Sequence, residues 1–128
     1  MRLLLIICAL LAFHPVFAQE NDGIKQFAIH LSLNERYRDT LNWDERIQQA
    51  VMTHEQLLKK MEKDGKIILA GTVDLPPRAP ERFEIIVLQP MTIDDAKGIL
   101  QQLPVVTSGM MRARLFPFDL KTVLPAQP

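Results

Sequence analysis

The stretch from residue 42 to residue 65, NWDERIQQAVMTHEQLLKKMEKDG, decides the fold. Its apolar residues recur at steps of three and four, the spacing that places side chains on one face of an α-helix. This face consists of Trp43, Ile47, Ala50, Val51, His54, Leu57, Leu58 and Met61. Asn42 followed by Glu45 predicts a capping box, and Gly65 predicts a left-handed residue just past the helix end. Only His54 on this face is titratable, which makes it the first candidate for a functional residue.

The first 18 residues have the pattern of a secretory signal peptide. A positive start at Arg2 precedes an apolar run at 3–13, and Val16 and Ala18 are the small residues that signal peptidase requires. The apolar run is shorter than the roughly 20 residues that a membrane-spanning helix needs. We therefore expect a periplasmic or secreted protein that begins near Gln19 and has no membrane segment after cleavage.

The rest of the chain divides into a disordered lead-in at 19–23, one domain at 24–118 and a C-terminal tail at 119–128. About 110 residues are enough for one hydrophobic core. The only cysteine, Cys8, lies in the signal segment, so neither disulfides nor thiol chemistry is expected in the domain. The 15 basic and 15 acidic residues balance, which argues against a nucleic-acid partner because such proteins carry a basic surface.

The domain contains further segments with clear secondary-structure patterns. Alternating or β-branched residues predict strands at 24–33, 66–71, 82–89 and 110–118. A second helix is predicted at 92–103, where Thr92 caps the start and Pro104 ends it. Three prolines in 72–81 predict a loop.

The order strand, helix, strand, strand, helix, strand predicts an α+β domain. We expect a ferredoxin-like βαββαβ arrangement, with both helices on one face of a four-stranded antiparallel sheet. In 82–89 both alternating sets, Phe83/Ile85/Val87 and Ile86/Leu88, are apolar, so the face without helices also needs a cover. We therefore expect a homodimer with the sheets face to face.

Several short motifs in this order resemble those of the YCII-related proteins, a family of small dimeric α+β barrels. The resemblance covers 27–118. Its anchors are His54-Glu55-Gln56-Leu57-Leu58, the run GKIILAG at 65–71, the strand at 83–88, Asp94-Asp95-Ala96, Pro104-Val105 with Gly109, and LFPF at 115–118.

The resemblance implies a ferredoxin-like subunit, dimerisation through the sheet, and a cleft at the helix–sheet boundary that holds a histidine–aspartate pair. His54 matches the family histidine. Leu103 stands where the family has the aspartate, and Val51 stands where it often has an arginine. Some relatives act on chlorinated aromatic compounds as lyase-like dehydrochlorinases.

The candidate site residues fall into two groups. His54 is the candidate general acid or base, and the alternative is a histidine hydrogen-bonded at the helix–sheet boundary. His30, Arg112 and Arg114 lie on neighbouring strands and are candidates for binding an anionic substrate, or for forming surface ion pairs. His30 and His54 lack a recognisable third ligand, so no metal is expected. The sequence has no glycine loop of the phosphate-binding type, so no cofactor is expected either.

Two functional interpretations follow. The first is a lyase- or isomerase-like enzyme that acts on a small anionic or aromatic molecule through His54. The alternative is a non-catalytic dimeric barrel that binds a small molecule, because Leu103 replaces the family aspartate. A cofactor-free monooxygenase is a third interpretation, since dimeric α+β barrels include such enzymes.

Overall fold

Four strands form one antiparallel sheet in the order β2-β3-β1-β4, which confirms the predicted α+β class and four-stranded sheet. The computed structural model describes residues 23–122, so the predicted signal peptide at 1–18, most of the lead-in and the end of the tail lie outside the described residues. The strands are β1 (Phe27–Leu33), β2 (Ile67–Thr72), β3 (Glu84–Leu88) and β4 (Met111–Pro117).

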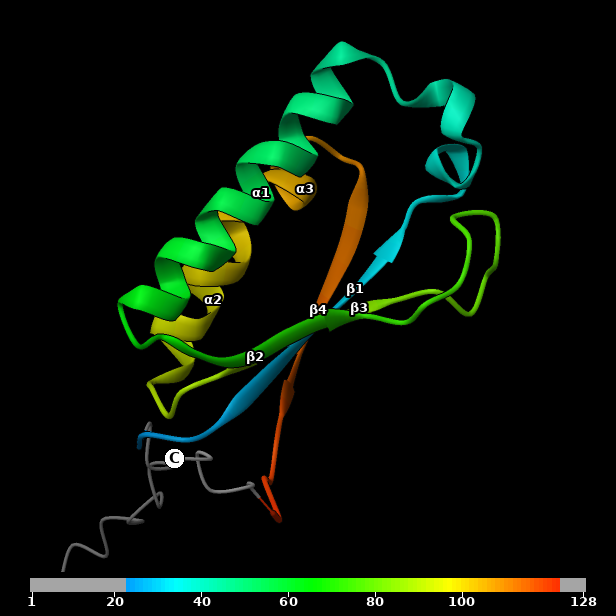
Figure 1. The fold of residues 1–128 in the computed structure, drawn as a ribbon. Helices are drawn as coiled ribbons and strands as arrows, with labels where there is room; N and C mark the ends of the chain where they lie inside the picture. The colour runs from blue at the N-terminus through cyan, green and yellow to red at the C-terminus, as the bar shows by residue number, and fades with distance from the viewer. Residues whose placement is uncertain (1–22, 123–128) are drawn as a thin grey trace, which may run out of the picture.

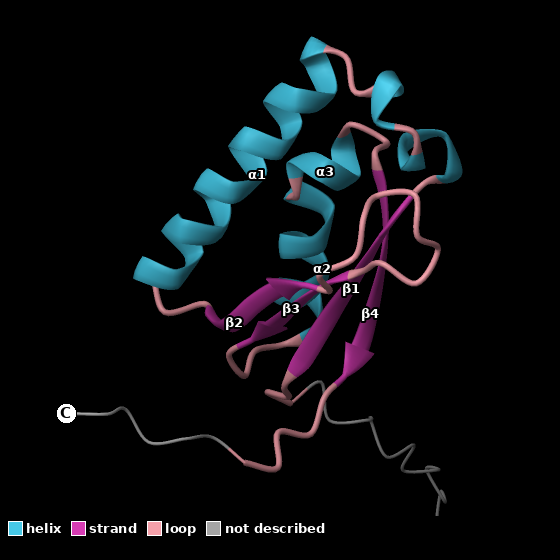
Figure 2. Cartoon of the chain, turned by 45° about the vertical axis from the view of Figure 1, so that its right-hand side comes forward, coloured by secondary structure: helices cyan, strands magenta, loops and turns pink. Residues whose placement is uncertain are grey.

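The helices lie together on one side of this sheet (Figure 1, Figure 2). They are α1 (Glu45–Lys63), α2 (Ile93–Gln102) and the short α3 (Pro104–Thr107). Two turns of 3₁₀-helix, η1 (Glu35–Arg38) and η2 (Thr40–Asn42), connect β1 to α1. None of the helices within 23–122 has the length and apolarity that crossing a membrane requires.

The ends of α1 correct one sequence prediction and confirm another. The N-cap is Asp44, whose side chain accepts a hydrogen bond from the Ile47 amide at 2.9 Å, so Asn42 is not the cap. Asn42 instead closes η2 and donates its side-chain amide to the carbonyl of Arg36. Gly65 has a φ of 68°, as expected of a residue that follows a helix in the left-handed conformation.

The connection between α2 and β4 contains the short helix α3, which was not predicted from the sequence. Thr92 caps α2 as predicted, by accepting a hydrogen bond from the Asp95 amide. Leu103 then adopts an extended conformation, and Pro104 starts α3 at a position where its missing N–H is not needed. Gly109, with a φ of 78°, turns the chain into β4.

The hydrophobic core lies between the helices and the inner face of the sheet. Alternate residues of β1 and β3 point into it, and Ile47 and Met61 of α1 meet them. The fully buried members include Ile29, Leu31, Ile47, Ile86, Leu88, Leu103, Val105 and Met110. Burial alternates along β1 from Ile29 to Leu33, where Ile29, Leu31 and Leu33 are buried and the residues between them are only half-buried.

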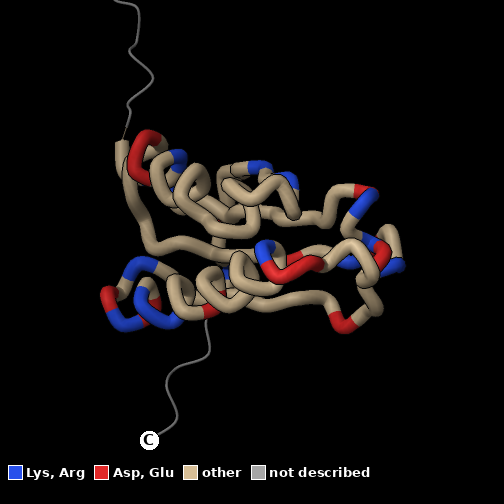
Figure 3. The backbone as a smooth tube through the Cα atoms, turned by 90° about the horizontal axis from the view of Figure 1, so that it is seen from above, with Lys and Arg blue, Asp and Glu red and all other residues tan. Residues whose placement is uncertain are grey.

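The outer face of the sheet carries an apolar row that crosses all four strands. Cross-strand pairing aligns Leu69 with Val87, Val87 with Ala28, and Ala28 with Phe116. The two central members are buried, whereas Leu69 is 47% exposed and Phe116 is 46% exposed. Figure 3 shows basic and acidic residues interspersed along the helices and loops, whereas the strands carry few of them.

Candidate functional site

Helix α1 presents His54 to the inner face of the sheet. His54 lies in the middle of the helix, on the same face as the buried Ile47 and Met61, and is only 3% exposed. Ile47 and Met61, which lie on either side of His54 along α1, pack into the core and hold His54 over the sheet.

Strand β3 brings a carboxylate to the same place. Glu84 is the first residue of β3 and pairs with Leu31 on one side and with Thr72 on the other. Glu84 is two residues before the core residue Ile86 in the same strand, so its side chain points toward the helices rather than toward the outer face. Glu84 is 7% exposed, which is unusual for a charged residue unless it is paired.

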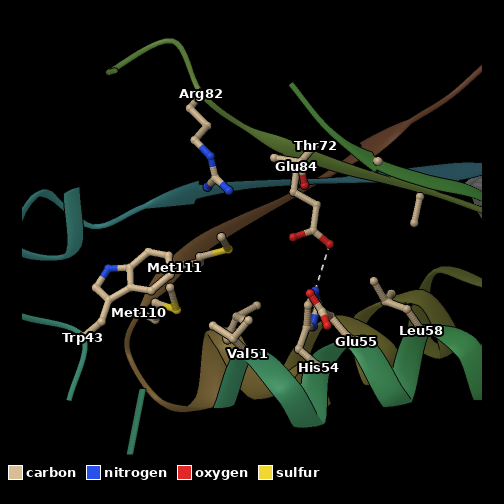
Figure 4. A pocket seen from close by; sticks show the side chains of 13 residues that line it. Trp43, Val51, His54, Glu55, Leu58, Thr72, Arg82, Glu84, Met110 and Met111 are labelled. Atoms are coloured by element: carbon tan, nitrogen blue, oxygen red, sulfur yellow. Dashed lines mark hydrogen bonds and ion pairs between the residues drawn. The ribbon is translucent and has the colours of Figure 1, made fainter. Parts of the chain in front are cut away.

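His54 and Glu84 form a buried hydrogen-bonded pair. The Nε2 atom of His54 lies 2.8 Å from the Oε1 atom of Glu84, and Figure 4 shows the two side chains pointing toward each other across the helix–sheet boundary. At this distance, with both side chains removed from water, the contact is a strong charge-assisted hydrogen bond. The residue that fixes the imidazole is therefore Glu84.

The pair also determines the tautomer of the neutral imidazole. The Nδ1 atom of His54 is buried and has no hydrogen-bond partner among residues 23–122. A proton on Nδ1 would be a buried donor without an acceptor, which costs about 1–3 kcal/mol, whereas a proton on Nε2 is donated to Glu84. We therefore assign the proton to Nε2, which leaves Nδ1 as the unprotonated nitrogen.

A pocket opens beside this pair, between α1, the edge of the sheet and the start of β4. Its volume is about 210 Å³. Apolar side chains form much of its wall, including Trp43, Val51, Leu58, Met110 and Met111. In Figure 4 one carboxylate oxygen of Glu84 is directed at His54, and the other is directed away from it into the pocket.

Hydrogen bonds hold the far wall of the pocket in place. The indole Nε1 of Trp43 donates to the carbonyl of Tyr37 at 2.7 Å. The guanidinium of Arg46, at the start of α1, donates to the carbonyl of Ser108 at 3.0 Å. The first bond ties Trp43, just before α1, to η1, and the second ties the first turn of α1 to the turn before β4, so both ends of this wall are held by the backbone of other segments.

The sequence-predicted site residues occupy opposite faces of the sheet. His54 lines the pocket on the inner face. Cross-strand pairing places Arg114 opposite His30 and Arg112 opposite Ser32, so the three predicted substrate-binding residues are neighbours on the outer face. There the His30 ring stacks on Phe83, with ring centroids 4.9 Å apart. Within one subunit, His54 and this outer group do not form one site.

Sequence reasoning missed Glu84, Arg82 and Trp43 as pocket residues. The signal for Glu84 is present in the predicted strand, where it is the one charged residue at 83–88 and falls in the same alternating set as Ile86 and Leu88. A carboxylate on the helix-covered face of a strand is expected to need a partner, and His54 is the titratable residue on the apolar face of the first helix.

Leu103, which stands where the resemblance expects an aspartate, is fully buried in the core. The part of the chain that the structure describes contains no group of three or more residues able to hold a metal ion. No protein-family model matches the sequence, and no curated protein matches it either.

Proposed function

We propose that this protein is a small-molecule enzyme that transfers protons, of the lyase or isomerase type, and that the His54–Glu84 pair is its acid–base group. The observation that carries the proposal is the buried 2.8 Å contact between His54 Nε2 and Glu84 Oε1 at the wall of a pocket. A structural ion pair does not require a cavity beside it, whereas a catalytic pair needs room for a substrate.

The geometry assigns different roles to the two residues. Glu84 has its second carboxylate oxygen in the pocket, within reach of a bound molecule (Figure 4). His54 donates its Nε2 proton to the first oxygen and so holds the carboxylate in place. In an isomerisation, the pair removes a proton from one carbon of the substrate and returns it to another. In an elimination, the proton stays on the pair while a leaving group departs with the electron pair of its bond.

The proposed family is that of the YCII-related proteins, and the proposed subunit is the ferredoxin-like βαββαβ arrangement of a dimeric α+β barrel. The strand order β2-β3-β1-β4 and the helices on one side of the sheet support this assignment. In this chain Glu84 would supply the carboxylate that the resemblance places at position 103. The same side-chain pair is then built from a strand rather than from the turn after α2.

We further propose that the protein is exported and forms a homodimer through the outer face of its sheet. The pattern at 1–18 supports export. The apolar row on the outer face supports the dimer, since a second sheet would cover the side chains of Leu69 and Phe116, which are about half exposed. The ligand is a small molecule that binds in the inner-face pocket. The dimer contact lies on the outer face and leaves that pocket open.

The test has two stages. Thermal-shift screening of small organic acids, phenols and carbonyl compounds identifies ligands, and each ligand is then assayed for conversion. We expect Glu84→Gln to lower turnover by about 100-fold or more, because the amide can neither accept nor deliver the proton. Glu81→Gln, the same change at an exposed residue of the preceding loop, serves as the control and should keep the wild-type rate.

Two results would contradict the proposal. Wild-type turnover by Glu84→Gln would show that the pair performs no proton transfer. Binding of several ligands without conversion of any would favour the alternative function, a dimeric barrel that binds a small molecule without catalysis.

A further inference from the structure

Arg82 places a positive charge in the pocket. It lies two residues before Glu84, so in the extended chain the two side chains leave the backbone on the same side. Arg82 is half-buried, and Figure 4 shows its guanidinium pointing into the cavity, between Trp43 and Glu84. Its direction follows from the short segment that leads into β3, the strand that positions the carboxylate.

Among residues 23–122 the guanidinium of Arg82 has no acidic partner. Neither of the salt bridges within residues 23–122 involves Arg82, and its side chain makes no hydrogen bond to a described residue. The other charged groups at the pocket are Glu84, which is bonded to His54, and Glu55, which is exposed on α1. A partly desolvated arginine with five free N–H donors is a ready partner for a bidentate anion.

The rest of the wall defines the body of the ligand. Trp43, Val51 and Met111 provide an apolar surface, and thioether and indole groups pack well against flat rings. The cavity volume is about 210 Å³, and cavities of about 150 Å³ already hold a benzene ring. One ring or a short branched chain with a small anionic group therefore fits.

We propose that Arg82 is the anion-binding residue of this pocket and that the ligand is a small carboxylate with an apolar body. The proposal rests on the proposed function in taking the pocket beside His54 and Glu84 as the ligand site. The carboxylate of the ligand pairs with the guanidinium of Arg82, and the apolar body lies against Val51 and Met111. This orientation brings the carbon atoms next to the ligand carboxylate toward the free oxygen of Glu84.

Trp43 makes the proposal directly measurable. It is the only tryptophan in the chain and it lines the pocket, so its fluorescence reports occupancy without any need for turnover. The probe is phenylacetate, and the control ligand is phenylacetamide, a neutral molecule of nearly the same shape. We expect saturable binding of phenylacetate to the full chain with a dissociation constant of about 1 mM or below, and binding of the amide that is weaker by about tenfold.

Variants locate the charge that is responsible. Arg82→Gln should weaken phenylacetate binding by about tenfold and abolish the preference over the amide. Arg82→Lys should retain part of the preference, because it keeps the charge but loses the planar fork. Arg78→Gln, at an exposed arginine of the same loop, should bind phenylacetate like the wild type.

Each contrary result overturns the proposal. These results are equal binding of acid and amide by the wild-type protein, unchanged affinity of Arg82→Gln, and no saturable response to phenylacetate. The first and third of them need no variant, so they do not depend on whether a substituted protein folds. Failure here is distinct from failure of the catalytic role, because Glu84→Gln is judged by turnover and Arg82→Gln by fluorescence titration.

Discussion

The two faces of the sheet hold their titratable residues in different ways. On the inner face His54 and Glu84 are buried and bonded to each other at 2.8 Å. On the outer face His30 stacks on Phe83, and Arg112 and Arg114 are exposed. Both faces contain a histidine close to charged residues, but only the inner one combines a buried pair with a cavity.

The difference shows that the surroundings of a strand residue depend less on its position along the strand than on the face to which its side chain points. Glu84 and Ile85 are adjacent in sequence. The side chain of Glu84 contacts His54 of α1 on the inner face, whereas Ile85 pairs with His30 of β1 on the outer face. A charge on the covered face must find a partner, because an unpaired buried carboxylate is costly. In the single subunit a charge on the outer face, such as that of Arg112 or Arg114, remains hydrated and needs none. The inner face therefore has the stronger constraint on residue identity.

The largest expected effect concerns the buried pair. His54→Leu removes the partner of Glu84 and leaves its carboxylate in a mostly buried position. We expect the free energy of unfolding to fall by about 3 kcal/mol or more, measured by urea denaturation. His30→Leu on the outer face should cost about 1 kcal/mol, the scale of a lost aromatic contact.

A double variant separates the pair from simple packing. His54→Leu combined with Glu84→Leu removes both polar groups and should recover much of the lost stability, because no buried carboxylate remains. Equal costs for His54→Leu and His30→Leu would contradict the distinction between the two faces.

The next effect compares adjacent isoleucines of β3. Ile86 is fully buried on the inner face, and Ile85 is half-buried on the outer face. Ile86→Ala should lower the free energy of unfolding by about 2–5 kcal/mol, and Ile85→Ala by about 1 kcal/mol. Both changes are Ile→Ala in the same strand, so the difference reports how well each face is packed. Thermal and urea unfolding of a dilute sample measure it, and equal losses would show that the outer face is as well packed as the core.

Most of the fold was predictable from the sequence because local patterns agree with the tertiary contacts. The stripe from Ile47 to Met61 has the helical period and packs on the core. Gly65 and Thr92 act at helix ends as their residue types suggest. The prediction of Asn42 as the cap was wrong because Asp44 is also a good cap, and the 3₁₀ turn at 40–42 uses Asn42 elsewhere.

The site was predictable only in part, since it depends on register between segments distant in sequence. His54 stood out as the titratable residue in an apolar stripe. Its partner Glu84 is 30 residues away, and the pairing depends on β3 lying beneath α1, which no local pattern encodes. The family resemblance implies an aspartate at position 103, where Leu103 instead fills part of the core.

Changes in the outer apolar row should have the smallest effect on the stability of the subunit. Their effect should fall on dimer formation. We expect Leu69→Glu combined with Phe116→Glu to convert the proposed dimer into a monomer with little change in the structure of the subunit. Both residues are about half exposed in the subunit, so the charges stay hydrated there. In a two-fold interface each substitution occurs twice, and the dimer dissociation constant should rise by about 100-fold or more.

Sedimentation velocity across a range of protein concentrations measures this shift. Met52→Glu, at an exposed apolar residue of α1, is the matched control and should leave the dimer intact. A wild-type protein that remains monomeric at micromolar concentrations would remove the need for a cover on this face. Loss of phenylacetate binding by the double variant would show that the two faces are coupled. The inner pocket would then keep its shape only while a second subunit covers the outer row.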